Sequence, residues 1–168
     1  YVLSKLLWDA ETDVERHIRE FTDYFYGAAA PYVRQYIDFL CDTAERENIH
    51  VGFNDVPKSN LFRDEILDHL DALMDQAEQA VAGDPLRLWR IGKASPSGRW
   101  VRLKRRTMLK NEYDPAEINR FFADWQAYGL TRIEEWTSRE TTHKALIRGM
   151  WHGTDFYDHW TGEGAELL

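Results

Sequence analysis

Apolar residues along most of this chain recur at alternating spacings of three and four, the period of an α-helix with one buried face. Residues 14–26 carry them at Val14, Ile18, Phe21 and Phe25. Residues 33–44 carry them at Val33, Tyr36, Ile37, Leu40, Cys41 and Ala44. Residues 61–82 carry them at Phe62, Ile66, Leu70, Leu73, Ala77 and Val81. The pattern predicts a series of amphipathic helices.

Helix start and stop signals separate these segments. Residues 12–15 and 137–140 have the S/T-x-x-E form of a capping box, and residues 114–117 give a further helix start. Glycines follow three of the predicted helices, at Gly27, Gly83 and Gly129. A glycine in this position accepts the left-handed conformation that often ends a helix. These helix starts are therefore predicted by residues whose side chains can cap a helix, and these helix ends by glycines whose backbone can leave it.

The helix that starts at Pro85 meets a second proline, Pro96, within its apolar pattern. A proline ring clashes with the carbonyl four residues earlier, and here that residue is Gly92, which leaves the backbone room to bend. We therefore expect a kinked helix that runs to about Asn111. The alternative is a loop over residues 92–98.

Together these elements predict a mainly α fold, an irregular bundle of about six or seven helices. We expect residues 1–136 to form a helical domain. Residues 137–168 would add one more helix and an irregular C-terminal tail packed on the same domain.

The first segment, Val2 to Trp8, has helical spacing but no capping residue before it. We interpret residue 1 as a cut within a longer multidomain protein, of which this chain is the C-terminal part. The apolar residues Val2, Leu3, Leu6 and Leu7 cover more of the helix than one buried stripe needs. We therefore expect this helix to contact an upstream domain as well as its own bundle.

Composition narrows the possible partners. The net charge of −8 argues against a protein that wraps nucleic acid. A basic cluster over residues 99–110 is interpreted as a solvated helix face. Cys41 is the only cysteine, so no internal disulfide can form, and we expect it to be a small buried residue. No apolar run is long enough to cross a bilayer.

The sequence offers no complete active site. Glu134 and Glu135 are neighbours and cannot flank one bond as the two carboxylates of a glycosidase must. The tail residues His152, Asp155, Asp158 and His159 lack a metal-ligand spacing, so we predict no metal and no cofactor. His143 is expected to be a hydrogen-bonded polar residue of a helix. We therefore name no catalytic residue.

Aromatic residues make up 14% of the chain. Most lie on predicted buried stripes, where such residues fill helix-bundle cores. Four lie in or near the irregular C-terminal region and are the candidates for ligand contact: Trp136, Trp151, Tyr157 and Trp160.

A family resemblance adds to this interpretation. It rests on Leu6–Asp9, Asp13-Val14, Phe21–Val33, Tyr36–Asp38, Ala80–Pro85, Phe121-Phe122, Gly129–Thr131 and Glu134. These residues resemble, in order and spacing, the C-terminal helical region of an uncharacterised bacterial glycoside-hydrolase-like family, domain of unknown function family 4838. The resemblance covers most of the chain up to about Trp136.

In that family the helical region follows a barrel of the hexosaminidase and alpha-glucuronidase type. The resemblance implies that the parent protein binds or hydrolyses carbohydrate, with catalytic carboxylates on the barrel, and that this chain supports the barrel structurally. A glycan-processing parent would be secreted or periplasmic. The alternative is a free-standing helical interaction module without enzymatic activity, whose groove binds a partner helix or peptide.

Overall fold

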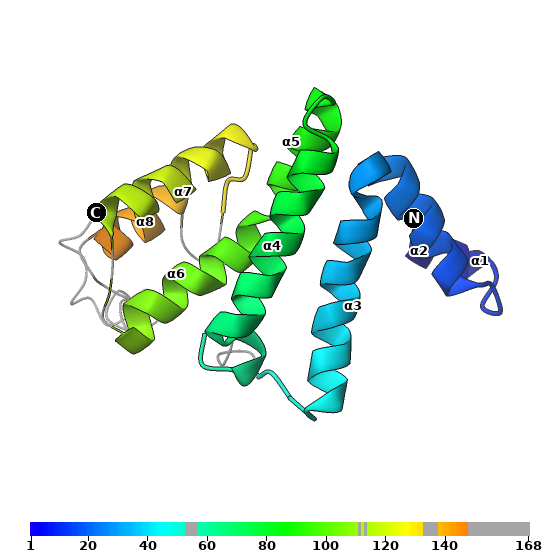
Figure 1. The fold of residues 1–168 in the computed structure, drawn as a ribbon, viewed down its shortest axis with the longest axis horizontal. Helices are drawn as coiled ribbons and strands as arrows, with labels where there is room; N and C mark the ends of the chain where they lie inside the picture. The colour runs from blue at the N-terminus through cyan, green and yellow to red at the C-terminus, as the bar shows by residue number, and fades with distance from the viewer. Residues whose placement is uncertain (53–56, 111, 113, 133–137, 148–168) are drawn as a thin grey trace.

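The computed structural model describes residues 1–52, 57–110, 112, 114–132 and 138–147. In this part of the chain eight α-helices and two short 3-10 helices follow one another without a strand (Figure 1). The α-helices are α1 (Val2–Trp8), α2 (Val14–Tyr26), α3 (Ala30–Arg46), α4 (Asp64–Ala80), α5 (Pro85–Ala94), α6 (Pro96–Lys110), α7 (Pro115–Ala127) and α8 (Arg139–Ile147). The 3-10 helices are Gly27–Ala29 and Asn60–Phe62.

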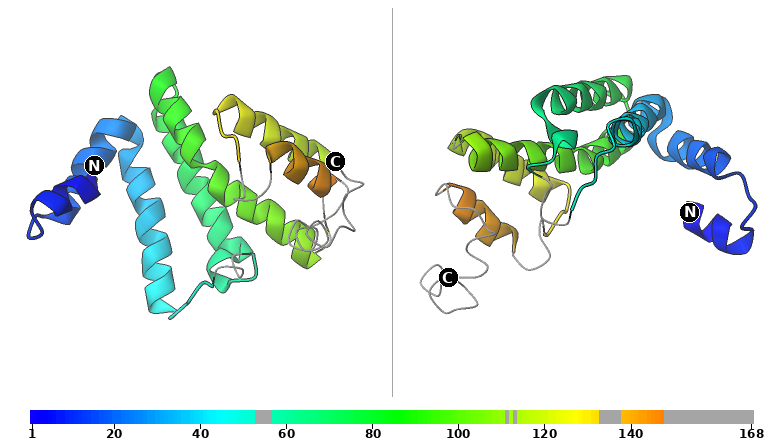
Figure 2. Two further views of the ribbon diagram at one scale, coloured as in Figure 1. Left: turned by 180° about the vertical axis from the view of Figure 1, so that it is seen from behind. Right: turned by 90° about the horizontal axis from the view of Figure 1, so that it is seen from below.

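The mainly α fold predicted from the sequence is confirmed. The helix count is one above the expected range because α5 and α6 are the two limbs of the helix that was predicted to kink. Figure 2 shows the chain as an elongated arrangement, with α1 and α2 projecting at one end and α7 and α8 packed together at the other. The antiparallel pair α3 and α4 lies between them. No helix in the described ranges combines the length and apolarity that crossing a membrane requires.

The core consists of three groups of buried apolar side chains. The first joins α3, α4 and α5 through Ala29, Val33, Met74, Ala77, Val81 and Ile91. The second joins α4 to α6 through Ile66, Leu67, Leu70 and Val101. The third joins α6, α7 and α8 through Leu103, Ile118, Phe121, Phe122, Trp125 and Leu146. Because α6 contributes to the second and third groups, it joins α4 to the pair α7 and α8.

The start of α2 corrects the predicted capping box. The Asp13 carboxylate, not the Thr12 hydroxyl, accepts the free N–H of the first turn, from Arg16 at 2.9 Å. Asp13 caps a helix as well as threonine does, and the sequence places both residues in front of the apolar run. The Thr12 side chain is therefore available for another contact.

The buried face of α3 also differs from the prediction. Cys41 and Ile37 are exposed, whereas Thr43 is fully buried. Val33 and Tyr36 pack with residues of α4, and the buried Thr43 hydroxyl accepts a hydrogen bond from Arg46 at 3.2 Å. A polar residue can take a buried position when its hydrogen bond is satisfied. The buried face of α3 was therefore misplaced because it was predicted from apolar residues alone.

The kink between α5 and α6 lies at Ser95, as the proline pattern predicted. Its N–H still donates to the Ile91 carbonyl at 2.9 Å, so the backbone continues through the bend. Gly92 has a second role that the sequence pattern did not indicate. A Cβ atom added there would lie 2.2 Å from Cζ of Tyr128, so only a glycine lets this ring pack on α5.

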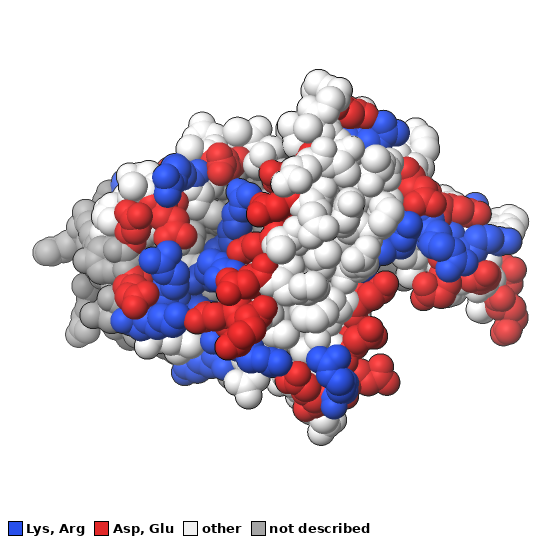
Figure 3. All heavy atoms as spheres, in the orientation of Figure 1, with Lys and Arg blue, Asp and Glu red and all other residues white. Residues whose placement is uncertain are grey.

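The basic cluster of α6 is paired with neighbouring helices and is only partly solvated. The Arg102 guanidinium lies 2.9 Å from Asp68 and 2.8 Å from Asp71, both on α4. Lys110 lies 2.7 Å from Asp64, and Arg106 pairs with Glu117 of α7. Figure 3 shows these opposite charges side by side across the face that carries α4 and α6. Arg102, Arg106 and Lys110 of the cluster therefore form ion pairs with acidic residues of the same chain.

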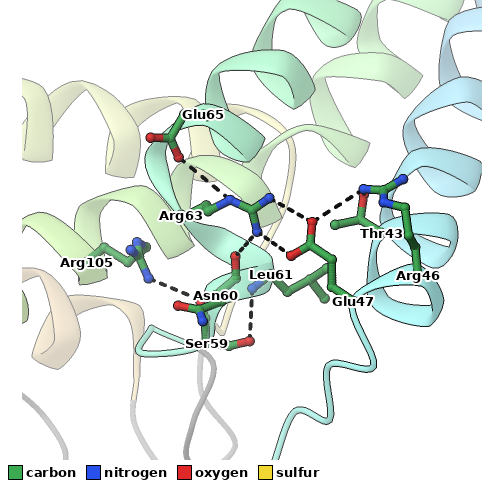
Figure 4. Close-up of polar contacts among 9 residues, drawn as sticks. All are labelled: Thr43, Arg46, Glu47, Ser59, Asn60, Leu61, Arg63, Glu65 and Arg105. Carbon is green, nitrogen blue, oxygen red and sulfur yellow. Dashed lines mark hydrogen bonds and ion pairs between the residues drawn. The ribbon is translucent and has the colours of Figure 1, made fainter.

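The connection from α3 to α4 is held by polar contacts (Figure 4). The Arg63 guanidinium donates to both carboxylate oxygens of Glu47, each at 2.9 Å, and holds the pKa of Glu47 below its usual range. Arg105 of α6 donates to the carbonyls of Pro57 and Ser59 at 2.6 and 3.2 Å. Bidentate Arg–carboxylate pairs are among the most geometrically specific contacts, so this end of the bundle has a fixed arrangement.

Helix α8 packs on α7, and its His143 is a hydrogen-bonded polar residue, as predicted. The imidazole Nε2 lies 2.7 Å from Asn119 Oδ1, and the ring stacks on Phe122 with centroids 4.4 Å apart. The predicted cap of this helix is shifted by one residue, because the Ser138 hydroxyl accepts the Thr141 N–H at 3.2 Å. Thr137 lies outside the described residues.

A pH-dependent stability follows from His143. Burial, with Arg139 beside it, lowers the pKa of this imidazole below the ordinary value of 6.5. The unfolded chain therefore binds more protons than the folded chain just below pH 6.5, so stability falls as the pH drops through 6.5 toward the folded pKa. Urea unfolding at a series of pH values should show this loss. The His143→Gln variant should lack that part of the pH dependence, and an unchanged profile in the variant would contradict the assignment.

Candidate functional site

The four aromatic candidates for ligand contact lie outside the described residues: Trp136, Trp151, Tyr157 and Trp160. The same holds for Glu134 and Glu135, and for the four tail residues that were considered as metal ligands. Within the described ranges, no group of three or more His, Cys, Asp or Glu side chains is placed to hold a metal ion. Among the described residues, the candidate functional surface is formed by α1 and α2.

Helix α1 presents uncovered apolar side chains. Leu3, Leu7 and Trp8 are 76%, 89% and 93% exposed, and none of the residues of α1 is buried. Val2 and Leu6 are half-buried, on the side where α1 packs on α2. The helix is therefore covered on one side only by the described residues. Its inner face packs on its own hairpin, and its outer face has no cover from the described residues.

Side chains of α2 and of the loop before it hold α1 in place. The Tyr1 hydroxyl donates to Glu20 Oε2 at 2.8 Å. His17 Nδ1 lies 2.9 Å from the same oxygen, and His17 Nε2 lies 2.9 Å from the Thr12 hydroxyl. In the tautomer that carries its hydrogen on Nδ1, that N–H donates to the carboxylate and Nε2 accepts a hydrogen bond from the Thr12 hydroxyl. These bonds join the first residue of the chain, the loop and α2.

The electrostatics of this network centre on Glu20. The hydrogen bonds from His17 and then from Tyr1 hold the pKa of the Glu20 carboxyl below its usual range. The hydrogen bond to Glu20 in turn raises the pKa of the Tyr1 hydroxyl. Both pKa shifts favour the ionised carboxylate of Glu20 and the protonated phenol of Tyr1. These are the states in which the hydrogen bond between them exists.

Aromatic rings continue this contact along α2. The ring of Tyr1 stacks on Phe21 at 6.1 Å between centroids, and Phe21 stacks on Phe25 at 5.3 Å. Arg90 of α5 lies 4.2 Å from the centroid of Phe25 and donates to its carbonyl at 2.7 Å. The row of rings thus connects α1, through α2, to the body of the molecule.

The order hydroxyl, imidazole, carboxylate in Thr12, His17 and Glu20 is the one used in nucleophilic triads. In such a triad the carboxylate is buried and serves only the imidazole. Here Glu20 also accepts from Tyr1, and its side chain is 46% exposed. The effect that the geometry supports is to orient α1 on α2.

The apolar and capping patterns of the sequence do not reveal this network. Its only local signal is the spacing of His17 and Glu20, which places them one turn apart on one face of a helix. The role of Tyr1 could not be predicted, because its bond to Glu20 spans a turn whose path the apolar pattern does not specify.

These features define a mainly α chain with a projecting N-terminal helical hairpin whose outer apolar face is not covered by the described residues. Residues 1–38 match the model of a family described as a domain of unknown function (DUF4838). The match covers α1, α2, the 3-10 turn and the first half of α3. It is shorter than the resemblance up to about Trp136 inferred from the sequence. No curated protein and no solved structure matches the chain.

Proposed function

We propose that this chain is a helical supporting domain of a carbohydrate-active, glycoside-hydrolase-like protein, and that the outer face of α1 packs against the barrel that carries the active site. The exposure of Leu3, Leu7 and Trp8 is the observation that carries this proposal. The three residues lie within the segment that matches the family model. A surface shared with a family is where a contact common to its members would lie.

The length of α1 supports the same conclusion. A helix of seven residues is too short to be stable from its own hydrogen bonds, because nucleation is costly and few bonds repay it. Its present contacts bury no residue completely. Covering a leucine contributes about 1.5–3 kcal/mol, so a partner over Leu3 and Leu7 would add about 3–6 kcal/mol.

The proposal predicts that substitutions on this face act only when the partner is present. In the 168-residue chain, the Leu3→Ser and Leu7→Ser double variant should change the free energy of unfolding by no more than about 0.5 kcal/mol, because both side chains are exposed. In the full-length protein the same variant should lose several kcal/mol of the coupling between the domains. Differential scanning calorimetry of both proteins measures the two effects.

A matched control is Leu86→Ser, which alters an exposed leucine of α5, outside the segment that matches the family. It should leave both proteins unchanged. Equal, small effects of the α1 variant in the two proteins would contradict the supporting role and favour a free-standing interaction module.

The proposal also predicts that the 168-residue chain does not hydrolyse glycosides on its own. Glycoside hydrolysis needs two carboxyl groups about 5–10 Å apart on opposite sides of the bond. The neighbouring residues Glu134 and Glu135 cannot supply that geometry. The measurement is release of nitrophenol from aryl glycosides by purified chain. Turnover that disappears in Glu134→Gln or Glu135→Gln would overturn this expectation.

A further inference from the structure

A small polar pocket lies where α3, α4 and α6 meet, next to the kink. Its volume is about 180 Å³, and its lining includes Tyr36 of α3, Asp71 and Asp75 of α4, and Gly98 and Arg99 of α6. At about 30 Å³ for each water molecule, it has room for about six waters. The described α1 surface contributes no residue to it, so it is a separate feature of the molecule.

Two sequence features open this pocket. The bend at Ser95 redirects the helix just before the residues of α6 that line the pocket. Gly98 then leaves its floor without a side chain. A Cβ atom added at Gly98 would lie 3.4 Å from the Tyr36 hydroxyl and 4.0 Å from Asp71 Oδ1. The pocket therefore depends on a glycine, and a larger residue at this position would occupy its floor.

The wall formed by α4 is anionic and only partly neutralised. Arg102 places both Nε and Nη2 on the same oxygen of Asp71, Oδ2, at 3.0 and 2.8 Å. The other oxygen, Oδ1, lies toward Gly98. Asp75, one turn further along α4, has no hydrogen bond or ion pair with any residue in the described part of the chain. Oδ1 of Asp71 and the carboxylate of Asp75 thus remain available to a donor.

The wall formed by α6 is cationic. The Arg99 guanidinium lies 3.8 Å from Glu78 and 3.7 Å from Asp124, so both ion pairs exceed the distance of a direct hydrogen bond. Its planar set of N–H donors suits a carboxylate. The Tyr36 hydroxyl adds a further donor, and burial raises the pKa of this phenol further above neutral pH.

We propose that this pocket binds a small zwitterion, a free α-amino acid with a short side chain. Its α-carboxylate would pair with Arg99, and its ammonium group would donate to Asp75 and to Asp71 Oδ1. A simple anion would face the two carboxylates of α4, and a simple cation would face Arg99. A molecule with both charges satisfies both walls. A pocket of about 180 Å³ has room for the six heavy atoms of alanine.

The test is a titration of the 168-residue chain with L-alanine, followed by NMR chemical shifts of the amides of α4 and α6. Saturable shifts at the pocket are expected. Propanoate and ethylammonium each carry only one of the two charges. Each should bind at least about tenfold more weakly than L-alanine, because it loses a charge-assisted contact. If either compound binds as tightly as L-alanine, the proposal that the ligand is a zwitterion is wrong. If L-alanine causes no saturable shift, the proposal that the pocket is a binding site is wrong.

Three variants assign the binding to the pocket. Asp75→Asn and Arg99→Gln should each weaken L-alanine binding by about tenfold, since each removes one charged partner. Gly98→Leu should abolish it by filling the floor. Asp42→Asn, which removes an exposed carboxylate of α3, is the matched control and should bind normally. Circular dichroism confirms that each variant is folded. A folded Gly98→Leu variant with full affinity would contradict the proposal.

Discussion

Replacing Phe122 by alanine should lower the free energy of unfolding by about 3–5 kcal/mol, the range for removing a buried phenylalanine ring. Phe122 is 4% exposed. Its ring meets Phe121 edge-on at 5.3 Å and stacks on the His143 imidazole at 4.4 Å. Alanine at this position removes both ring contacts and leaves a cavity among the buried side chains of α6, α7 and α8. Urea unfolding followed by circular dichroism measures the loss.

The control for this substitution is Tyr24→Ala, because Tyr24 is an aromatic residue of α2 that is 79% exposed. It should change the free energy of unfolding by no more than about 0.5 kcal/mol. A loss of less than about 1 kcal/mol in Phe122→Ala would show that α7 and α8 do not form the core described above.

The second large effect is a change of sign at Gly92. In the native background, Gly92→Ala should destabilise by about 1–2 kcal/mol, because its Cβ would overlap the Tyr128 ring. In a Tyr128→Ser background the same substitution should stabilise by about 0.5–1 kcal/mol, since alanine is a better helix former than glycine. Comparing the four proteins in a double-mutant cycle measures the coupling between positions 92 and 128.

Gly83→Ala is the comparison for this cycle, because a Cβ atom at Gly83 would meet no atom within 4 Å. Its effect should be the same with tyrosine or serine at position 128. If Gly92→Ala also has the same effect in both backgrounds, the Tyr128 ring does not pack on α5 in solution.

The sequence predicted the features that depend on neighbours along the chain. The apolar spacing of α4, the glycine after α2 and the proline kink before α6 are all local, and the structure confirms them. The kink could be predicted because the clash of a proline ring involves only the preceding turn. The contact of Tyr128 with Gly92 joins residues 36 positions apart, and no local pattern encodes it.

The charges of α6 illustrate the same limit. Six basic residues in twelve positions suggest a solvated face, but Arg102 and Lys110 find their partners 31 and 46 residues earlier in the chain. On α1, the apolar pattern showed that two sides of the helix are hydrophobic, but not which side its own bundle covers. The candidate ligand residues of the C-terminal region stay a prediction, since they lie outside the described residues.

The continuity of α3 has a consequence for how any partner of α1 would be oriented. The segment that matches the family ends at residue 38, within this helix of 17 residues. An uninterrupted helix acts as a rigid rod, about 25 Å long for this number of residues. A single residue inserted after position 38 would turn the second half of α3 by about 100 degrees and advance it by about 1.5 Å. The α1–α2 hairpin and the rest of the bundle therefore have a fixed relative rotation about the axis of α3. A chimera joined inside α3 must preserve the helical register.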